Sequence, residues 1–291
     1  MKHTQKNKTP FNDSIQLMHN EFPEDFHEVA ELPGKYEEEA KKDVNQDGNI
    51  AEEMDICSIV NLDGDWFSPK MVFSGQYQST PVDEPKLMQM GQYEIQMIYE
   101  YNLPPILAIL TNIPKEKHLQ ELEITCGTIL KPVYLVYDEE NIEKRLNRAK
   151  AIINNNENLS NVDALNLGMI AVFAPRDKAQ EIIEEVIKLY ARVSQQLSKL
   201  MELTLYSVLF QMIDAYSKQE EDYQRLLKML DDNTDEETKE FSKTMRELKE
   251  KYNAREEDYA AVVKENQTLK QQINSLKEEI TILNHGPVNG K

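Results

Sequence analysis

The sequence is poor in cysteine, in long apolar runs and in positive charge, and each shortage excludes a class of protein. Its two cysteines, Cys57 and Cys126, cannot build a disulfide framework and have no metal-ligand spacing. No run approaches the roughly 20 apolar residues of a membrane-spanning helix, and the opening MKHTQKNKTP lacks the apolar core of a signal peptide. These shortages favour a cytoplasmic protein with no membrane partner.

The charge balance argues against non-specific binding to nucleic acids. With 33 basic and 52 acidic side chains, the net charge is −19, which opposes attraction to phosphate backbones. The sequence also has no phosphate-binding glycine-rich loop and no G-x-S-x-G motif, so the commonest nucleotide-binding and hydrolase classes lose support. A length of 291 residues allows one well-packed domain with an appendage, or two modest domains.

The order of apolar patterns predicts an α/β domain with a mixed central sheet flanked by helices, followed by a long helical coiled coil. Alternation in residues 54–62 and 70–79, on either side of a D-G turn, predicts a β-hairpin. Further strands are expected at 103–114, 130–138 and 168–175, helices at 11–32 (broken at Pro23), 83–102, 138–154, in a short stretch after Ser160 and from 177 onward, and a loop at 33–53. The expected divisions are a disordered tail (1–11), the α/β domain (12–200), connecting helices (201–234), a coiled coil (235–285) and a short tail (286–291).

One acidic stretch resembles a calcium-binding loop. Asp43, Asn45, Asp47 and Gly48 occupy the first, third, fifth and sixth positions of an EF-hand loop. The last position, where a bidentate Glu is required, is Met54, which removes two of the oxygens that calcium needs. The stretch is therefore interpreted as an acidic turn, and calcium binding stays open as the alternative.

The C-terminal part has apolar residues at alternating steps of four and three from Phe241 to Leu283, interrupted at Arg255 and Asn266. A repeat of this period keeps its stripe in register when the helix supercoils around a partner, which predicts a parallel two-stranded coiled coil and a homodimer. The alternative is a helical hairpin within one chain, with residues 185–230 as the partner. The residues expected to form the dimer contact are Asn266, Leu269, Ile273, Leu276, Ile280 and Leu283.

The predicted hairpin gathers one carboxylate and two amides. If its turn centres near Asp65, the residue opposite Asp55 is about Gln76, and a period-two strand places Gln78 on the same face as Gln76. Without further information, such residues are most simply explained as polar groups at the rim of a hairpin, bonded to each other or to water.

This layout resembles the PD-(D/E)XK nuclease superfamily. In that superfamily an Asp is followed, after an interval of about twenty residues with a hairpin, by Glu-x-Lys or Glu-x-Gln at the end of the next strand and then by a helix. The run from Met54 to Leu87 is similar to the recombination-promoting nuclease or transposase-like branch, and the similarity extends over about residues 12–200. The resemblance implies a restriction-endonuclease-like fold and a Mg²⁺-dependent DNA endonuclease.

The resemblance assigns Asp55 as the first metal-binding acid and Gln78 as the Lys/Gln position, with Gln76 in the place of the second acid. A neutral amide removes a full negative charge from a site that must hold a dehydrated Mg²⁺ ion, so the site is expected to be catalytically degenerate. The acidic residues Glu52, Glu53, Asp63 and Asp65 are candidates for a migrated carboxylate.

The spacing of Gln89 and Tyr93 on the next helix resembles a DNA-contacting motif of some members of the superfamily. The sequence thus supports three readings: a degenerate nuclease-like protein that retains DNA binding, a cytoplasmic scaffold or regulatory protein, and an active endonuclease with a migrated acid. The acidic net charge favours the scaffold, and the motif layout favours the nuclease fold.

Overall fold

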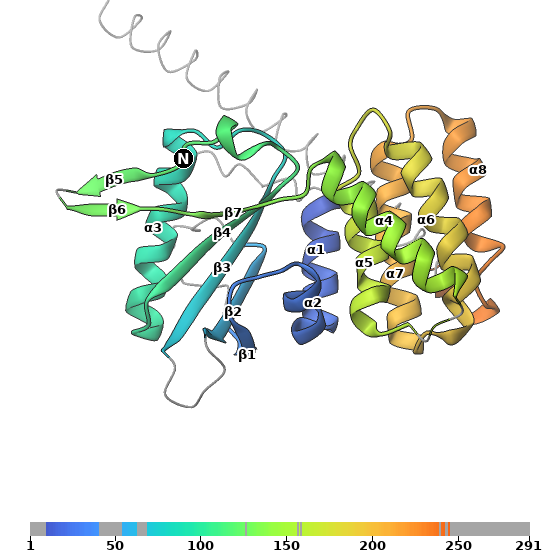
Figure 1. Cartoon of the computed structure of the whole chain (residues 1–291), viewed down its shortest axis with the longest axis horizontal. Coiled ribbons are helices and arrows are strands. Elements are labelled where there is room, and N and C mark those ends of the chain that lie inside the picture. The colour runs from blue at the N-terminus through green and yellow to red at the C-terminus, as the bar shows by residue number, and fades with distance from the viewer. Residues whose placement is uncertain are drawn as a thin grey trace, which may run out of the picture. The chain divides into compact units, whose positions relative to one another are not determined.

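The computed structural model describes residues 10–40, 54–62, 69–125, 127–155, 157, 159–238, 240–241 and 244 (Figure 1). The chain divides into two compact units, Met1–Thr234 and Asp235–Lys291. The calcium-like loop from 43 to 53, the acids at 52, 53, 63 and 65, and the coiled-coil positions from 266 to 283 lie outside the described residues. Within the described residues, no helix is both long enough and apolar enough to span a membrane.

A mixed five-stranded sheet forms the centre of the first unit. β1 (Lys35–Glu39), β2 (Ile56–Asn61) and β3 (Lys70–Gln78) pair antiparallel in that order, and β4 (Pro105–Thr111) and β7 (Val133–Val136) continue the sheet with parallel pairing. A separate hairpin consists of β5 (Leu122–Thr125) and β6 (Thr128–Leu130). The predicted α/β class, the mixed sheet and the β2–β3 hairpin are confirmed.

The helices belong to two groups. α1 (Pro10–Glu21) and α2 (Pro23–Val29) precede β1, and α3 (Glu84–Tyr101) lies between β3 and β4 in the chain. The remaining helices follow the sheet and are α4 (Glu139–Asn154), α5 (Asn161–Val172), α6 (Ala179–Val193), α7 (Lys199–Tyr216) and α8 (Glu220–Asp231), with short 3₁₀ turns at Lys115–Lys117 and Ser194–Gln196. α7 packs against α1 and α5, so residues 201–216 lie within the first unit.

Two separate apolar cores cover the two faces of the sheet. On one face, α3 packs against β3 and β4, with Leu87, Met90 and Met97 facing Val72 and Ile109. On the opposite face, α1 and α2 lie against the sheet and α4–α8 form a helical layer beside them (Figure 1). Because β3 lies between β2 and β4 and is covered on both faces, its alternate side chains enter two different cores.

Three local predictions differ from the structure. Residues 168–172, expected in a strand, continue α5, whose residues from Ala164 to Val172 are all buried; a fully buried helix shows the same unbroken apolar run as a buried strand. The acidic segment Lys35–Glu39, expected in a loop, is β1, an edge strand that is largely exposed. The β5–β6 hairpin was not expected; it packs on α3, where a Cβ on Gly91 would meet side-chain atoms of Leu130 and Ile124 at 2.9 and 3.0 Å.

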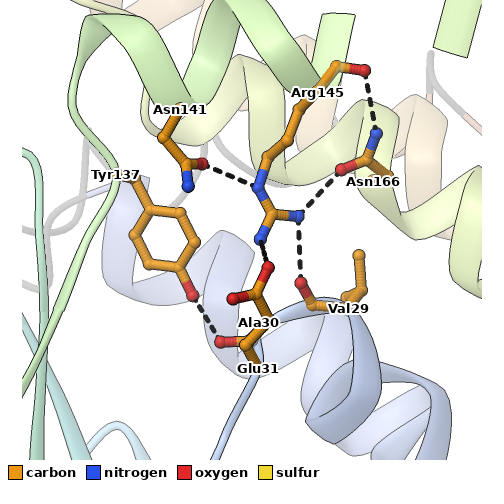
Figure 2. A network of polar contacts seen from close by, with 7 residues as sticks. All are labelled: Val29, Ala30, Glu31, Tyr137, Asn141, Arg145 and Asn166. Atoms are coloured by element: carbon orange, nitrogen blue, oxygen red, sulfur yellow. Dashed lines mark hydrogen bonds and ion pairs between the residues drawn. The ribbon is translucent and has the colours of Figure 1, made fainter. Parts of the chain in front are cut away.

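A buried arginine ties the N-terminal helices to the helical layer (Figure 2). The Arg145 guanidinium donates to the Val29 carbonyl at 3.0 Å, to Asn166 Oδ1 at 2.9 Å, to Glu31 Oε1 at 2.9 Å and, through Nε, to Asn141 Oδ1 at 2.8 Å. Its side chain is 12% exposed. The planar donors of one side chain thus connect the end of α2 with α4 and α5.

We expect Arg145→Ala to destabilise the protein by about 3 kcal/mol, because the buried carbonyl and amide oxygens lose a charged donor. Arg148→Ala is the matched control on α4: its side chain is 72% exposed and lies 3.6 Å from Asp163, so removal should cost less than about 1 kcal/mol. Urea unfolding followed by circular dichroism measures both values. Equal losses for the two variants would contradict this structural role.

Two histidines share one hydroxyl beneath the sheet. His19 Nε2 and His27 Nε2 lie 2.9 and 3.2 Å from Ser58 Oγ, and all three side chains are buried. The rings of Tyr36 and Phe73 lie 5.4 Å from the His27 ring. Burial lowers the pKa of His27 to about 4, so this imidazole is neutral in the folded protein at neutral pH.

This lowered pKa predicts a loss of stability in acid. Because the His27 pKa is about 4 in the folded state and 6.5 in an exposed imidazole, the contribution is complete above pH 6.5 and disappears as the pH falls toward 4. At pH 5 the loss should be about 2 kcal/mol. Denaturant unfolding at pH 7 and pH 5 measures it, and His27→Phe, which cannot titrate, should show a smaller pH dependence; an unchanged dependence would contradict the prediction.

Candidate functional site

The register of the central hairpin brings the predicted residues together. Ile56 pairs with Gly75 and Cys57 with Ser74, so Asp55, directly before β2, lies near Gln76, the residue that follows Gly75. In the parallel direction, Gln76 pairs with Ile109 and Gln78 with Thr111. α3 begins soon after β3, with Asp83 capping its first turn by accepting from the Lys86 N–H. The order of an acid directly before one strand, two amides near the end of the next strand and a following helix is therefore present in the fold.

Asp55 is buried and accepts two hydrogen bonds from other parts of the protein. Its Oδ2 accepts from the Tyr77 backbone N–H at 2.8 Å, and its Oδ1 accepts from Gln16 Nε2 of α1 at 3.4 Å. The side chain is 3% exposed. Asp55 thus closes the end of the β2–β3 pairing and contacts the α1 side of the sheet.

Gln76 belongs to the opposite face. Alternation along β3 places Val72, Ser74, Gln76 and Gln78 toward α3, while Phe73 and Tyr77 enter the other core. Gln76 is 3% exposed and its Oε1 has no hydrogen-bond partner, whereas Gln78 is half-buried. Asp55 and Gln76 are therefore close along the backbone, but the Asp55 side chain contacts α1 and the Gln76 side chain faces α3.

A second carboxylate lies in the layer with Gln76. Glu94 of α3 is 3% exposed, and its Oε1 accepts a hydrogen bond from the hydroxyl of Ser74. Its Oε2 has no hydrogen-bond partner. Burial raises the pKa of the Glu94 carboxyl to about 7, and the Ser74 hydrogen bond opposes that shift. Near neutral pH this buried group is therefore balanced between its protonated and charged forms.

Cys57 and Tyr93 form a second polar contact in the same layer, between their own side chains. Cys57 Sγ lies 3.2 Å from Tyr93 Oη, and both side chains are buried. Burial raises the pKa of Tyr93, so the phenol stays protonated. Gln89, predicted with Tyr93 to contact DNA, is exposed on α3, and Lys86 Nζ donates to its Oε1 at 3.5 Å. The two residues therefore do not share a surface: Gln89 faces solvent, and Tyr93 packs in the core.

The two-carboxylate metal site implied by the resemblance does not fit the residues near Asp55. Among the residues that the structure describes, no group of three or more His, Cys, Asp and Glu side chains could hold a metal ion. Gln76 contributes a neutral oxygen, and the Asp55 oxygens accept from the backbone of β3 and from α1. We therefore derive no catalytic step from a metal at Asp55.

Three residues of this region were missed by the sequence reasoning: Gln16, Ser74 and Glu94. A signal for Glu94 exists, because it continues the buried stripe Leu87, Met90, Glu94 and Met97, spaced by three and four residues. A carboxylate on the apolar face of a helix marks a buried polar contact. Gln16 carries no comparable signal, since its contact with Asp55 joins residues 39 positions apart.

Comparison with known proteins gives no match: no family model, no curated protein and no solved structure matches this chain.

The position of Asp55 predicts that its replacement affects folding as well as any activity. Asp55→Ala leaves the buried Tyr77 N–H without an acceptor and should cost about 1–3 kcal/mol. Asp55→Asn keeps an oxygen acceptor and should cost distinctly less. Thermal and urea unfolding of the two variants give the comparison, and an equal cost would show that the hydrogen bond to Tyr77 contributes little.

Proposed function

We propose that this chain is a PD-(D/E)XK nuclease-like protein with a degenerate active site, which binds DNA without cutting it and acts as a homodimer in the cytoplasm. The single observation that supports the proposal best is that Asp55 lies directly before β2 and Gln76 near the end of β3, the strand paired with β2 and followed by α3. This is the layout that the resemblance requires, with an amide in place of the second acid. The coiled coil expected in residues 235–285 supplies the dimer.

The loss of cleavage follows from charge. Hydrolysis of a phosphodiester by this superfamily needs a divalent ion held by two carboxylates, and Gln76 supplies none of that charge. The Asp55 carboxylate is also committed to the Tyr77 N–H and to Gln16. A net charge of −19 further limits contact with DNA to a restricted surface of the protein.

A second candidate is an interaction protein without a nucleic-acid role. Ile95, Ile98 and Tyr99 form a stripe on α3 and are 40%, 42% and 83% exposed. Apolar side chains gathered on one helix face are typical of protein-binding surfaces. This stripe and the acidic charge favour the scaffold reading, and the same experiment separates the two candidates.

The test is a cleavage and binding assay on plasmid and duplex DNA with Mg²⁺ or Mn²⁺. The wild type should bind duplex DNA, with an affinity that falls as salt rises, and should leave plasmid intact. Gln76→Glu supplies the second carboxylate that the resemblance requires; because Asp55 contacts α1 whereas residue 76 faces α3, cleavage should appear only at a low level, and adding Asp55→Asn should abolish it. Gln92→Glu, which adds the same charge at an exposed site on α3, is the matched control and should stay inactive.

Two results would contradict the proposal in different ways. Cleavage by the wild type that disappears in Asp55→Asn would identify an active endonuclease, with a carboxylate supplied from elsewhere in the chain. Absence of both cleavage and DNA binding in every folded variant would leave the interaction protein. Circular dichroism on each variant excludes loss of folding as the cause.

A further inference from the structure

The two edges of the central sheet differ in how they resist pairing with another strand. β1, at one edge, has the sequence KYEEE, and its register with β2 is irregular between Tyr36 and Glu38. Charged side chains and bulges are the features that keep an edge strand from binding a further strand. β7, at the other edge, has the uncharged sequence VYLV and a regular register with β4. β7 is therefore the less protected edge of the sheet.

The backbone groups of β7 alternate between β4 and the open side of the strand. The Tyr137 N–H donates to the Thr111 carbonyl at 2.8 Å. Because the direction of these groups alternates along a strand, those of Leu135 also face β4, whereas those of Tyr134 and Val136 face outward. Within the residues that the structure describes, no other strand pairs with β7. Two N–H and two C=O groups on the outer side of β7 can therefore bond to another strand.

A second copy of β7, running antiparallel, can use all of these groups. A closely spaced hydrogen-bonded pair needs two outward-facing residues opposite each other. A two-fold axis at Leu135 provides two such pairs, because Tyr134 of each chain then lies opposite Val136 of the other. An axis at Tyr134 would place Val136 opposite Pro132, which has no N–H, and an axis at Val136 would place Tyr134 opposite Asp138, beyond the end of the strand. The axis at Leu135 is therefore favoured.

The ends of this pairing are complementary in charge. In this register Lys131, just before one β7, lies close to Asp138 and Glu139, just after the β7 of the second copy. The side chains of Lys131 and Glu139 are 73% and 55% exposed, and within one chain they contact Glu121 and Lys178. Opposite charges on facing strands attract each other, and the two-fold axis repeats the contact at both ends. The edges thus attract each other although each chain has a net charge of −19.

We propose that β7 pairs with β7 of a second copy of this chain, antiparallel about a two-fold axis at Leu135, so that two five-stranded sheets join into one. Tyr134 and Val136 supply the hydrogen bonds, and Lys131 contacts Glu139 of the second copy at each end. This contact is separate from the coiled coil expected in residues 235–285, and it does not depend on the proposed binding of DNA.

The experiment is disulfide cross-linking of the full chain, with Cys126 replaced by serine and Cys57 buried. Facing residues on antiparallel strands have Cβ atoms about 4.5–5.5 Å apart, which is close to the separation in a disulfide. Leu135→Cys should therefore form a covalent dimer under mild oxidation. Val133→Cys is the matched control, because Val133 is 40% exposed whereas Leu135 is half-buried, so random collisions favour position 133. In the proposed register the two copies of residue 133 are about 13 Å apart, and they should cross-link at least about tenfold more slowly.

Two further changes test the pairing through groups that the single chain does not need for its sheet. Val136→Pro removes an outward N–H that β4 does not use, and it should abolish the cross-link at position 135. Lys131→Glu should slow the cross-link about threefold or more, because like charges then meet at both ends, and adding Glu139→Lys should restore the rate. Circular dichroism on each variant confirms that it is folded.

Cross-linking at position 133 that equals or exceeds that at 135, or no cross-link at either position in folded chains, would overturn the inference and leave β7 to an extended segment of a different protein. The outcomes also separate this inference from the proposed function. A chain that binds DNA without cross-linking at 135 contradicts the edge pairing alone. A chain that cross-links at 135 but has no affinity for DNA contradicts the proposed function alone.

Discussion

The antiparallel pairing of β2 with β3 is the constraint on which the other features depend. Its register places Asp55 beside Gln76 and Cys57 beside Ser74, and a shift of one residue would exchange every side chain between the two cores. Such a shift is costly because all six residues of β2 are buried and β3 is buried over most of its length. The candidate residues are thus held by burial on both faces rather than by a flexible loop.

Both cores contain buried polar groups, and on each side some atoms have no hydrogen-bond partner, among them His27 Nδ1 on the side of α1 and α2. On the α1 and α2 side, Ser58 receives two imidazoles, Asp55 accepts from a backbone N–H, and Arg145 satisfies acceptors from α2, α4 and α5. These hydrogen bonds connect the helices to the sheet and to one another, and so stabilise the fold. On the α3 side, Glu94 and Gln76 each retain an unpaired oxygen close to the end of β3. An unsatisfied polar atom is costly to bury, so these groups lower stability on both sides of the sheet.

The sequence was most informative where a pattern had one interpretation. Alternation on either side of a D-G turn predicted the hairpin, and the predicted pairing of Asp55 with Gln76 agrees with the register of Ile56 and Gly75. It was ambiguous at 168–172, where an apolar run fits a buried strand and a buried helix equally well. It could not reveal that Asp55 reaches Gln16 or that Ser74 reaches Glu94, because those contacts depend on how helices pack over the sheet.

Residues 76 and 94 lie in the same buried layer under α3, so a charge at one position affects the charge that the other can carry. A glutamate at 76 would lie on the same buried face of β3 as the Ser74–Glu94 contact, and two carboxylates in one apolar layer repel each other unless a cation or a proton lies between them. An amide at 76 avoids that repulsion while keeping an oxygen in place. Burial raises the pKa of the Glu94 carboxyl, because even a single negative charge is disfavoured in this layer. The neutral residue at 76 therefore keeps a second full negative charge out of the buried layer that already contains Glu94.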